Sequence, residues 1–148
     1  MSLRAWTDEE LRQLLVRVRR IAVLGIKPES QADRPAHYVP AYLHRAGFEI
    51  LPVPVYEFGV ATILGRPIYR RLADVPGPID LVNVFRRSAD LPAHLEDLLA
   101  ARPRVVWFQS GIRHDGVAAA LEAAGIAVVQ DRCLMVDHGR LFRLSGNS

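Results

Sequence analysis

The chain has 148 residues, of which 50% are hydrophobic and 24% charged, and this length and composition predict one globular domain with a single sizeable core. The net charge of +3 is not gathered in a long basic run or in a basic stripe with interleaved aromatic residues, which argues against nucleic-acid binding. The lone cysteine, the lack of a signal-peptide pattern and the lack of an apolar run of about 18 residues exclude an internal disulfide and a membrane span and predict a cytoplasmic protein.

The first predicted element is an amphipathic helix from Thr7 to about Arg19. Thr7 and Glu10 have the spacing of a capping box, in which each side chain accepts a hydrogen bond from the backbone of the other residue. Residues 1–20 are therefore expected to form an extra helix that precedes the sheet. Its apolar face is formed by residues that recur at helical spacing, Leu11, Leu14, Leu15 and Val18.

Five short apolar runs predict five buried strands of a parallel sheet: Ile21–Gly25, Glu49–Pro54, Asp80–Phe85, Arg104–Gln109 and Ala127–Gln130. Three helical segments separate most of them, Pro35–Ala46, Ser88–Ala101 and Asp115–Ala124. Pro40 is expected to shift the start of the first of these helices or to kink its first turns. Between the second and third strands, Tyr69–Ala73 forms at most a short helix, and residues 138–148 are expected to be a short tail that is frayed at its end.

Strands that alternate with helices predict an α/β fold in which right-handed crossovers join the strands of a parallel sheet. We expect a single Rossmann-like domain over residues 1–148, with a doubly wound five-stranded sheet and helices on both faces. The preferred strand order is 3-2-1-4-5. The flavodoxin-like order 2-1-3-4-5 is the main alternative, and the sequence leaves it open.

The segments that follow the strands predict a ligand site, because ligands of open parallel sheets bind beyond the carboxyl ends of the strands. The loop after the first strand begins at Gly25 and leads to a helix, whose free N–H groups and dipole favour phosphate. Lys27, the only lysine of the chain, lies in this loop. Arg86 and Arg87 follow the third strand, so the edge suits a long ligand with an anionic end.

Two common nucleotide sites do not fit the sequence. The first loop lacks G-x-G-x-x-G, and the first acid after the second strand, Glu57, lies too far along the chain to hold the ribose of NAD. A Walker P-loop is excluded because no G-x-x-x-x-G-K-[ST] sequence is present. No metal site is expected, because metal-ligand spacing is missing among the five histidines, His37, His44, His94, His114 and His138.

An ordered set of segments resembles the small CoA-binding domain proteins, which are similar to the N-terminal CoA-binding domain of the succinyl-CoA synthetase alpha subunit. These segments are Val23–Gly25 with Arg34-Pro35, Leu51–Val55, Leu64–Pro67, Val84–Arg87, Val106–Gly111 and Asp131–Cys133. The resemblance runs from about Ile21 to Val136 and implies a Rossmann-like sheet that binds coenzyme A or an acyl-CoA across its carboxyl edge. It implies no catalytic residue, because the phosphohistidine of the synthetase relatives lies in a second domain for which this chain has no room.

The chain departs from its relatives after the second strand, where many of them carry Asn-Pro and this sequence has Val55-Tyr56. Tyr56 is interpreted as a residue that lies against the adenine of the ligand. The resemblance places Cys133 near the pantetheine end. A small buried thiol is favoured over a nucleophile with His138 as its base, and a mixed disulfide with the thiol of CoA is an intermediate hypothesis.

The residues expected to contact the ligand follow the five strands: Gly25, Ile26, Lys27, Ser30, Arg34, Pro54, Tyr56, Phe85, Arg86, Arg87, Gln109, Gly111, Ile112 and Cys133. The phosphates are assigned to Lys27, Ser30, Arg86 and Arg87 and the apolar part of the pantetheine arm to Ile26, Pro54 and Ile112. Only one of the two arginines is expected to face the ligand, while the other pairs with an acid such as Asp90 or lies in solvent.

The leading hypothesis is a CoA-binding protein that carries, senses or sequesters CoA or an acyl-CoA and has no catalytic role of its own. One alternative is an enzyme or redox protein that depends on NAD(P) or another nucleotide. Another is an interaction module that dimerises through the N-terminal helix, so a second copy or an unidentified protein is the expected macromolecular partner.

Overall fold

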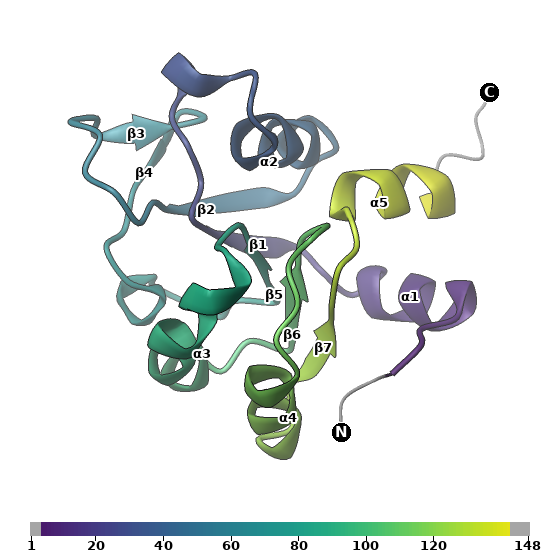
Figure 1. The fold of residues 1–148 in the computed structure, drawn as a ribbon. Coiled ribbons are helices and arrows are strands. Elements are labelled where there is room, and N and C mark those ends of the chain that lie inside the picture. Colours follow the sequence, from purple (N-terminus) through teal and green to yellow (C-terminus); the bar gives the residue numbers. More distant parts are fainter. Residues whose placement is uncertain (1–3, 143–148) are drawn as a thin grey trace.

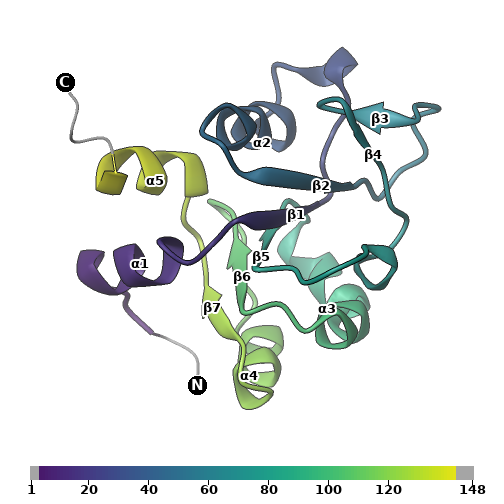
Figure 2. The same cartoon turned by 180° about the vertical axis from the view of Figure 1, so that it is seen from behind.

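The computed structural model describes residues 4–142 and contains a five-stranded parallel sheet between two helical layers (Figures 1 and 2). The strands of this sheet are β1 (Arg20–Leu24), β2 (Glu49–Val53), β5 (Leu81–Val84), β6 (Val105–Phe108) and β7 (Ala127–Val129). The α-helices are α1 (Asp8–Leu15), α2 (Pro35–Arg45), α3 (Leu95–Ala101), α4 (Asp115–Ala123) and α5 (Leu134–Phe142). All five predicted strands are therefore confirmed, and the α/β class with them.

The order of the strands differs from the preferred prediction. The order is β2-β1-β5-β6-β7, which corresponds to 2-1-3-4-5 among the five sheet strands, so 3-2-1-4-5 is wrong and the flavodoxin-like alternative is correct. β5 pairs with β1 from Ile21↔Leu81 to Leu24↔Val84, on the side of β1 that β2 leaves free. The order therefore reverses between β1 and β5, and the loops after these two strands emerge next to each other.

No long helix joins β2 to β5. The connection contains the antiparallel hairpin of β3 (Thr62–Ile63) and β4 (Arg66–Pro67) and the short 3₁₀ helix η2 (Leu72–Asp74). The Leu72 and Ala73 N–H groups donate to the Asp97 carboxylate of α3 at 2.7 and 3.0 Å, which fixes this connection against α3. The short helix expected at Tyr69–Ala73 thus lies slightly later in the chain.

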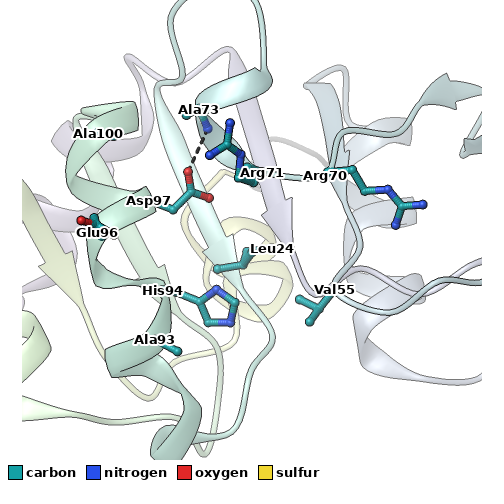
Figure 3. A pocket seen from close by; sticks show the side chains of 10 residues that line it. All are labelled: Leu24, Val55, Arg70, Arg71, Ala73, Ala93, His94, Glu96, Asp97 and Ala100. Atoms are coloured by element: carbon teal, nitrogen blue, oxygen red, sulfur yellow. Dashed lines mark hydrogen bonds between the residues drawn. The ribbon is translucent and has the colours of Figure 1, made fainter.

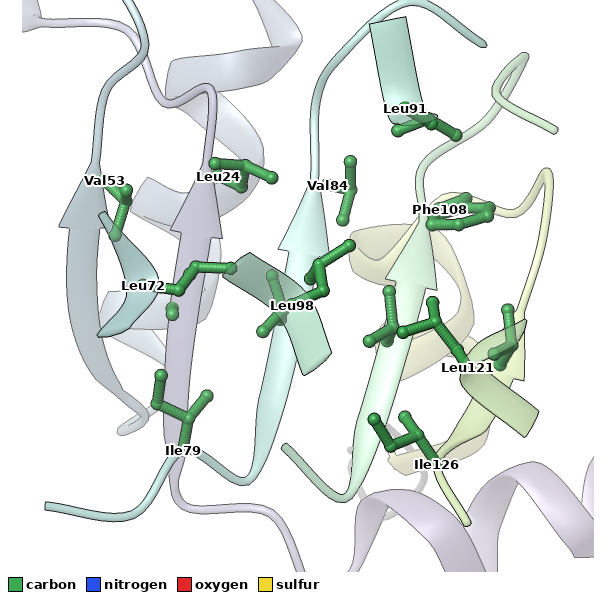
Figure 4. Packing of buried hydrophobic residues seen from close by; sticks show 14 of the residues in the cluster. Leu24, Val53, Leu72, Ile79, Val84, Leu91, Leu98, Phe108, Leu121 and Ile126 are labelled. Atoms are coloured by element: carbon green, nitrogen blue, oxygen red, sulfur yellow. The ribbon is translucent and has the colours of Figure 1, made fainter. Parts of the chain in front are cut away.

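Alternate residues of the strands face the two helical layers, as the two-residue period of a strand requires. On one face, Leu24, Val84 and Phe108 pack with α3, α4 and η2 in a continuous buried cluster (Figure 4). On the other face, Val23 and Trp107 pack with α1, α2 and α5. Both faces are buried, which explains why the strands read as nearly continuous apolar runs.

The N-terminal helix has the predicted capping box: Glu10 N–H donates to Thr7 Oγ1 at 3.1 Å, and Thr7 N–H donates to the Glu10 carboxylate at 3.0 Å. The helix ends at Leu15, earlier than the expected Arg19, because the chain then turns into β1. The indole N–H of Trp6 donates to the Val128 carbonyl at 3.0 Å. Since β7 is an outer strand of the sheet, this bond attaches the start of the chain to its edge.

The expected tail from residue 138 is corrected, because residues 134–142 form helix α5. Asp137 is only 4% exposed, and its carboxylate accepts hydrogen bonds from Arg132 at 2.6 and 3.0 Å and from Arg140 at 3.1 Å. The predicted frayed end, Ser145–Ser148, lies outside the described residues.

The predicted helix over Ser88–Ala101 is divided into the 3₁₀ helix η3 (Ser88–His94) and α3. Pro92 lies in the 3₁₀ part and has no N–H to donate. Between residues 4 and 142, no helix has the length and apolar character needed to cross a membrane.

Candidate functional site

The candidate site lies where the loops after β1 and β5 meet at the carboxyl edge of the sheet. Gly25 has a φ of +90°, and a Cβ at this position would lie 2.3 Å from the Phe85 carbonyl oxygen and 3.3 Å from Cδ of Arg86. A side chain therefore does not fit at residue 25, and only glycine adopts this conformation without strain. The predicted residues Gly25, Phe85 and Arg86 are in this way brought together.

The backbone of the first loop is already hydrogen-bonded within the protein. Gly25 N–H donates to the Val53 carbonyl at 2.9 Å, and Lys27 N–H donates to the Ala36 carbonyl at 3.1 Å. The Ala36 carbonyl is available because Pro40, four residues later in α2, has no N–H to donate to it.

The start of α2 offers few free donors as well. Pro35, its first residue, has no N–H, and the N–H groups of His37 and Tyr38 both donate to the Arg34 carbonyl at 2.9 Å. The N–H groups of His37 and Tyr38 are therefore not free to bind a phosphate, contrary to the expectation for the start of this helix. The remaining donors of this region are side chains, among them Lys27 and the exposed Ser30 and Arg34.

Arg86 has three polar side-chain partners at the site. Its side chain is 15% exposed, and its Nε donates to His94 Nε2 at 3.2 Å. One terminal nitrogen donates to the Tyr56 hydroxyl at 3.4 Å, and the other lies 3.4 Å from the Asp90 carboxylate. Arg86 thus connects the loop after β2 with the loop after β5 and with η3.

Arg87 has a different environment. Its side chain is 82% exposed, and its Nε donates to the Asp90 carboxylate at 3.1 Å. The hydrogen bond from Arg87, together with the charges of Arg87 and Arg86, lowers the pKa of Asp90 below its ordinary value. Of the two arginines, Arg86 is held inward at the site, while Arg87 forms the predicted pair with Asp90 in solvent.

Tyr56 is an exposed aromatic residue beside two cations. The residue is 57% exposed, and its ring centroid lies 5.5 Å from Arg86 Cζ and 5.8 Å from Lys27 Nζ. Lys27 Nζ also lies 5.9 Å from the ring of Phe58, which packs edge-on against Tyr56. The hydrogen bond and positive charge of Arg86 lower the pKa of Tyr56. Two cations and two aromatic rings are therefore gathered after β1, β2 and β5.

A groove of about 420 Å³ opens beside this cluster (Figure 3). Leu24 and Val55 line it at the ends of β1 and β2. His94 of η3 and Asp97 of α3 line it from the other side of the groove. The sequence did not predict the groove, because its lining comes from segments that are far apart in the chain. The remaining lining residues are Arg70, Arg71, Ala73, Ala93, Glu96 and Ala100. Among them, only the adjacent arginines at 70 and 71 form a pattern that the sequence could have shown.

The loops after β6 and β7 form a second part of the edge. Gln109 is 4% exposed, and its side-chain oxygen accepts hydrogen bonds from Asn83 Nδ2 at 3.2 Å and from Leu134 N–H at 3.3 Å. Gly111 N–H donates to the Asp131 carboxylate at 2.7 Å, which joins the loop after β6 to the loop after β7. The Gln109 side chain therefore fixes the start of α5, and it leaves little surface for a ligand.

The apolar candidates differ in their accessibility. Ile26 is fully buried among the residues of the α2 face, which leaves its side chain no surface for the expected contact with the pantetheine arm. Pro54 is also buried, whereas Ile112 is partly exposed next to the α3 face. Of the three, Ile112 is the side chain that offers apolar surface.

Cys133 is a free, partly buried cysteine that packs against the α2 face, directly before α5. His138, the base considered for it, has its Nδ1 2.8 Å from the Tyr42 hydroxyl, and its ring contacts Phe48 and Phe142. Within residues 4–142, no cluster of three or more His, Cys, Asp and Glu could hold a metal ion.

The arrangement suits an elongated anionic ligand with an aromatic ring. Arg86 and Lys27 supply charge-assisted donors for phosphate oxygens, and the open ring of Tyr56 supplies a stacking surface. The groove and Ile112 supply apolar surface on either side of the loop after β5.

Known proteins are similar to this chain in sequence. The family model described as "CoA binding domain" matches residues 19–139. The YneT protein of Bacillus subtilis (strain 168) is 37% identical over 130 residues, which cover 87% of this chain and 92% of YneT.

Solved structures share the fold. The structure of cell-free ID.343 from Thermus thermophilus has a TM-score of 0.85 and 46% identity and covers 93% of this chain and 100% of that chain. A dinucleotide forming acetyl-coenzyme A synthetase 1 of Ca. Korarchaeum cryptofilum has a TM-score of 0.64 and 15% identity and covers 74% of this chain and 25% of that chain. At this low identity, the likeness to the synthetase shows the fold alone.

Proposed function

Because the chain belongs to the family of CoA-binding domains, we propose that it binds coenzyme A or an acyl-CoA at the carboxyl edge of its sheet. The observation that carries this proposal is the position of Arg86, which is held by three partners at the point where the loops after β1, β2 and β5 converge. Such a fixed guanidinium gives planar, directed donors to phosphate oxygens.

The donor set fits the chemistry of CoA. Lys27, Ser30 and Arg86 would hold the diphosphate and the ribose phosphate, with Arg87 as an outer cation. Tyr56 would stack against the adenine, and Ile112 would contact the apolar part of the pantetheine arm. When bound, CoA supplies a thiol that carries acyl groups as thioesters.

We further propose that the protein carries, senses or sequesters its ligand in the cytoplasm and does not transform it. Support comes from His138, the base considered for Cys133, whose Nδ1 lies 2.8 Å from the Tyr42 hydroxyl. A general base needs a free nitrogen within hydrogen-bond reach of the nucleophile that it activates, and this pairing occupies one of the two ring nitrogens of His138.

The test is a thermal-shift panel with CoA, acetyl-CoA, NAD, NADP and ATP, followed by titration calorimetry. A ligand that binds only the folded state raises stability by about 2.7 kcal/mol at a concentration one hundred times its Kd. We expect CoA and acetyl-CoA to raise Tm and NAD to leave it unchanged. A shift with NAD and none with CoA would overturn the proposal in favour of a nicotinamide-dependent protein.

A further inference from the structure

The groove contains a histidine whose protonation state is fixed by its neighbour. Arg86 Nε lies 3.2 Å from His94 Nε2 and donates a hydrogen bond to it. An arginine side chain only donates hydrogen bonds, so Nε2 of His94 must accept and cannot carry a proton. His94 is therefore the neutral imidazole with its proton on Nδ1. Figure 3 shows its ring beside Leu24 at the centre of the groove.

Charged groups surround His94 on several elements. Burial, followed by the positive charge of Arg86, lowers the pKa of His94, whereas Asp97 and Asp90 raise it, and the net effect is a lowered pKa. Arg70, Arg71 and Glu96 line the same groove. Asp97 is already engaged by two N–H groups of η2, and Asp90 by Arg87. The carboxylates around His94 thus have cationic or N–H partners of their own.

Resting on the CoA site proposed above, we infer that neutral His94 is the positioning residue that aims Arg86 at the anionic part of the ligand, so that protonation of His94 weakens binding. A proton on Nε2 removes the acceptor for Arg86 Nε and places two cations about 3 Å apart. Arg86 then keeps only Tyr56 and Asp90 as partners, and the latter is shared with Arg87. The guanidinium turns away from its ligand-binding position, and its donors are no longer fixed.

The sign of the pH dependence follows from the direction of the pKa shift. His94 is neutral near pH 7 and gains its proton only below its ordinary range of about 6.5. Affinity for CoA is therefore full at neutral pH and falls once the pH is low enough to protonate His94. A groove that used charged His94 to attract phosphate would show the opposite trend.

The experiment measures Kd for CoA by titration calorimetry from about pH 8 to about pH 5, with the wild-type chain and His94→Gln. The Gln side-chain oxygen accepts from Arg86 Nε but does not titrate in this range. Between the upper and the lower end of this range, we expect the Kd of the wild type to rise by a factor roughly three- to tenfold larger than the Kd of His94→Gln. His44→Gln, which removes an exposed histidine of α2, is the matched control and should follow the wild type.

The phosphate monoester of CoA also titrates near these pH values, and this contribution is common to all variants. The difference between the wild type and His94→Gln therefore isolates His94. Identical pH profiles for the two proteins, or wild-type affinity that rises toward low pH, would overturn the inference while leaving CoA binding intact. A wild-type chain that binds no CoA at any pH would instead overturn the proposed function.

Discussion

The carbonyl oxygen of Phe85 lies 2.3 Å from the point at which a Cβ of residue 25 would stand. Gly25 directly follows β1, and Phe85 directly follows β5, which pairs with β1 on the side away from β2. This contact brings together two loops that are far apart in the sequence, at the candidate site. It requires backbone to approach backbone with no side chain between them.

The first prediction is that Gly25→Ala destabilises the fold more than a glycine substitution without a collision. Gly125 follows α4 with a φ of +86°, close to the +90° of Gly25, but a Cβ there meets nothing within 4 Å. Both variants pay the conformational strain, and only Gly25→Ala adds the clash with Phe85. We expect an additional loss of about 1–3 kcal/mol in the free energy of unfolding, measured in urea. Equal losses for the two variants would show that the loops separate freely.

Arg86→Ala is expected to weaken CoA binding by about tenfold or more, because the hydrogen bonds of a charged donor are lost. Comparing CoA with dephospho-CoA by calorimetry assigns the side chain: a larger loss for CoA places it at the ribose phosphate, and equal losses place it at the diphosphate. Arg87→Ala is the matched control, since its side chain is 82% exposed and paired with Asp90. It should change affinity far less, and the reverse ranking would mean that Arg87 is the ligand-facing arginine.

Tyr56→Ala should weaken CoA by about 1–3 kcal/mol if the adenine stacks on the ring. Tyr56→Phe keeps the ring but removes the hydroxyl that accepts from Arg86, so it should retain most of the affinity. Tyr38, a 42% exposed tyrosine of α2, provides Tyr38→Ala as the control for loss of an exposed aromatic residue. Pantetheine, which has no adenine, should bind the wild type and Tyr56→Ala equally, and a difference there would argue against stacking.

The packing of α5 on α2 is expected to weaken in acid through His138. Burial lowers the pKa of His138, whose ring contacts the aromatic residues of both neighbouring segments. The folded state therefore favours the neutral form, and the unfolded chain binds more protons as the pH falls below about 6.5. The contribution of neutral His138 to the free energy of unfolding is full above this pH and decreases below it. Urea titrations of the wild type and His138→Gln should show a smaller loss of stability at low pH for the variant.

Much of the secondary structure could be predicted from local sequence patterns. The strands are buried on both faces, so their apolar runs identify them within one residue, and Thr7 with Glu10 specifies the start of α1. The strand order could not be read in this way. Which side of β1 receives β5 depends on the path of residues 54–80, which pack through long-range contacts such as that of Asp97 with Leu72.

Helix α5 was missed for a related reason. Its buried face contains Asp137 between Leu134 and Leu141, and a carboxylate at that position interrupts the apolar pattern. Only the structure shows that Arg132 and Arg140 neutralise it. The candidate site was also predictable only in part. Arg86, Lys27 and Tyr56 could be proposed from the sequence, whereas the role proposed for His94 depends on its distance from Arg86.

The bond from the Trp6 indole to the Val128 carbonyl has a consequence beyond the attachment of the first helix. An outermost strand with unpaired backbone groups invites further strands from other molecules to add to it, which leads to aggregation. The indole N–H of Trp6 occupies one of these acceptors, the Val128 carbonyl, and its bulky ring lies at this edge of the sheet. The chain thereby shields its own margin from uncontrolled self-association.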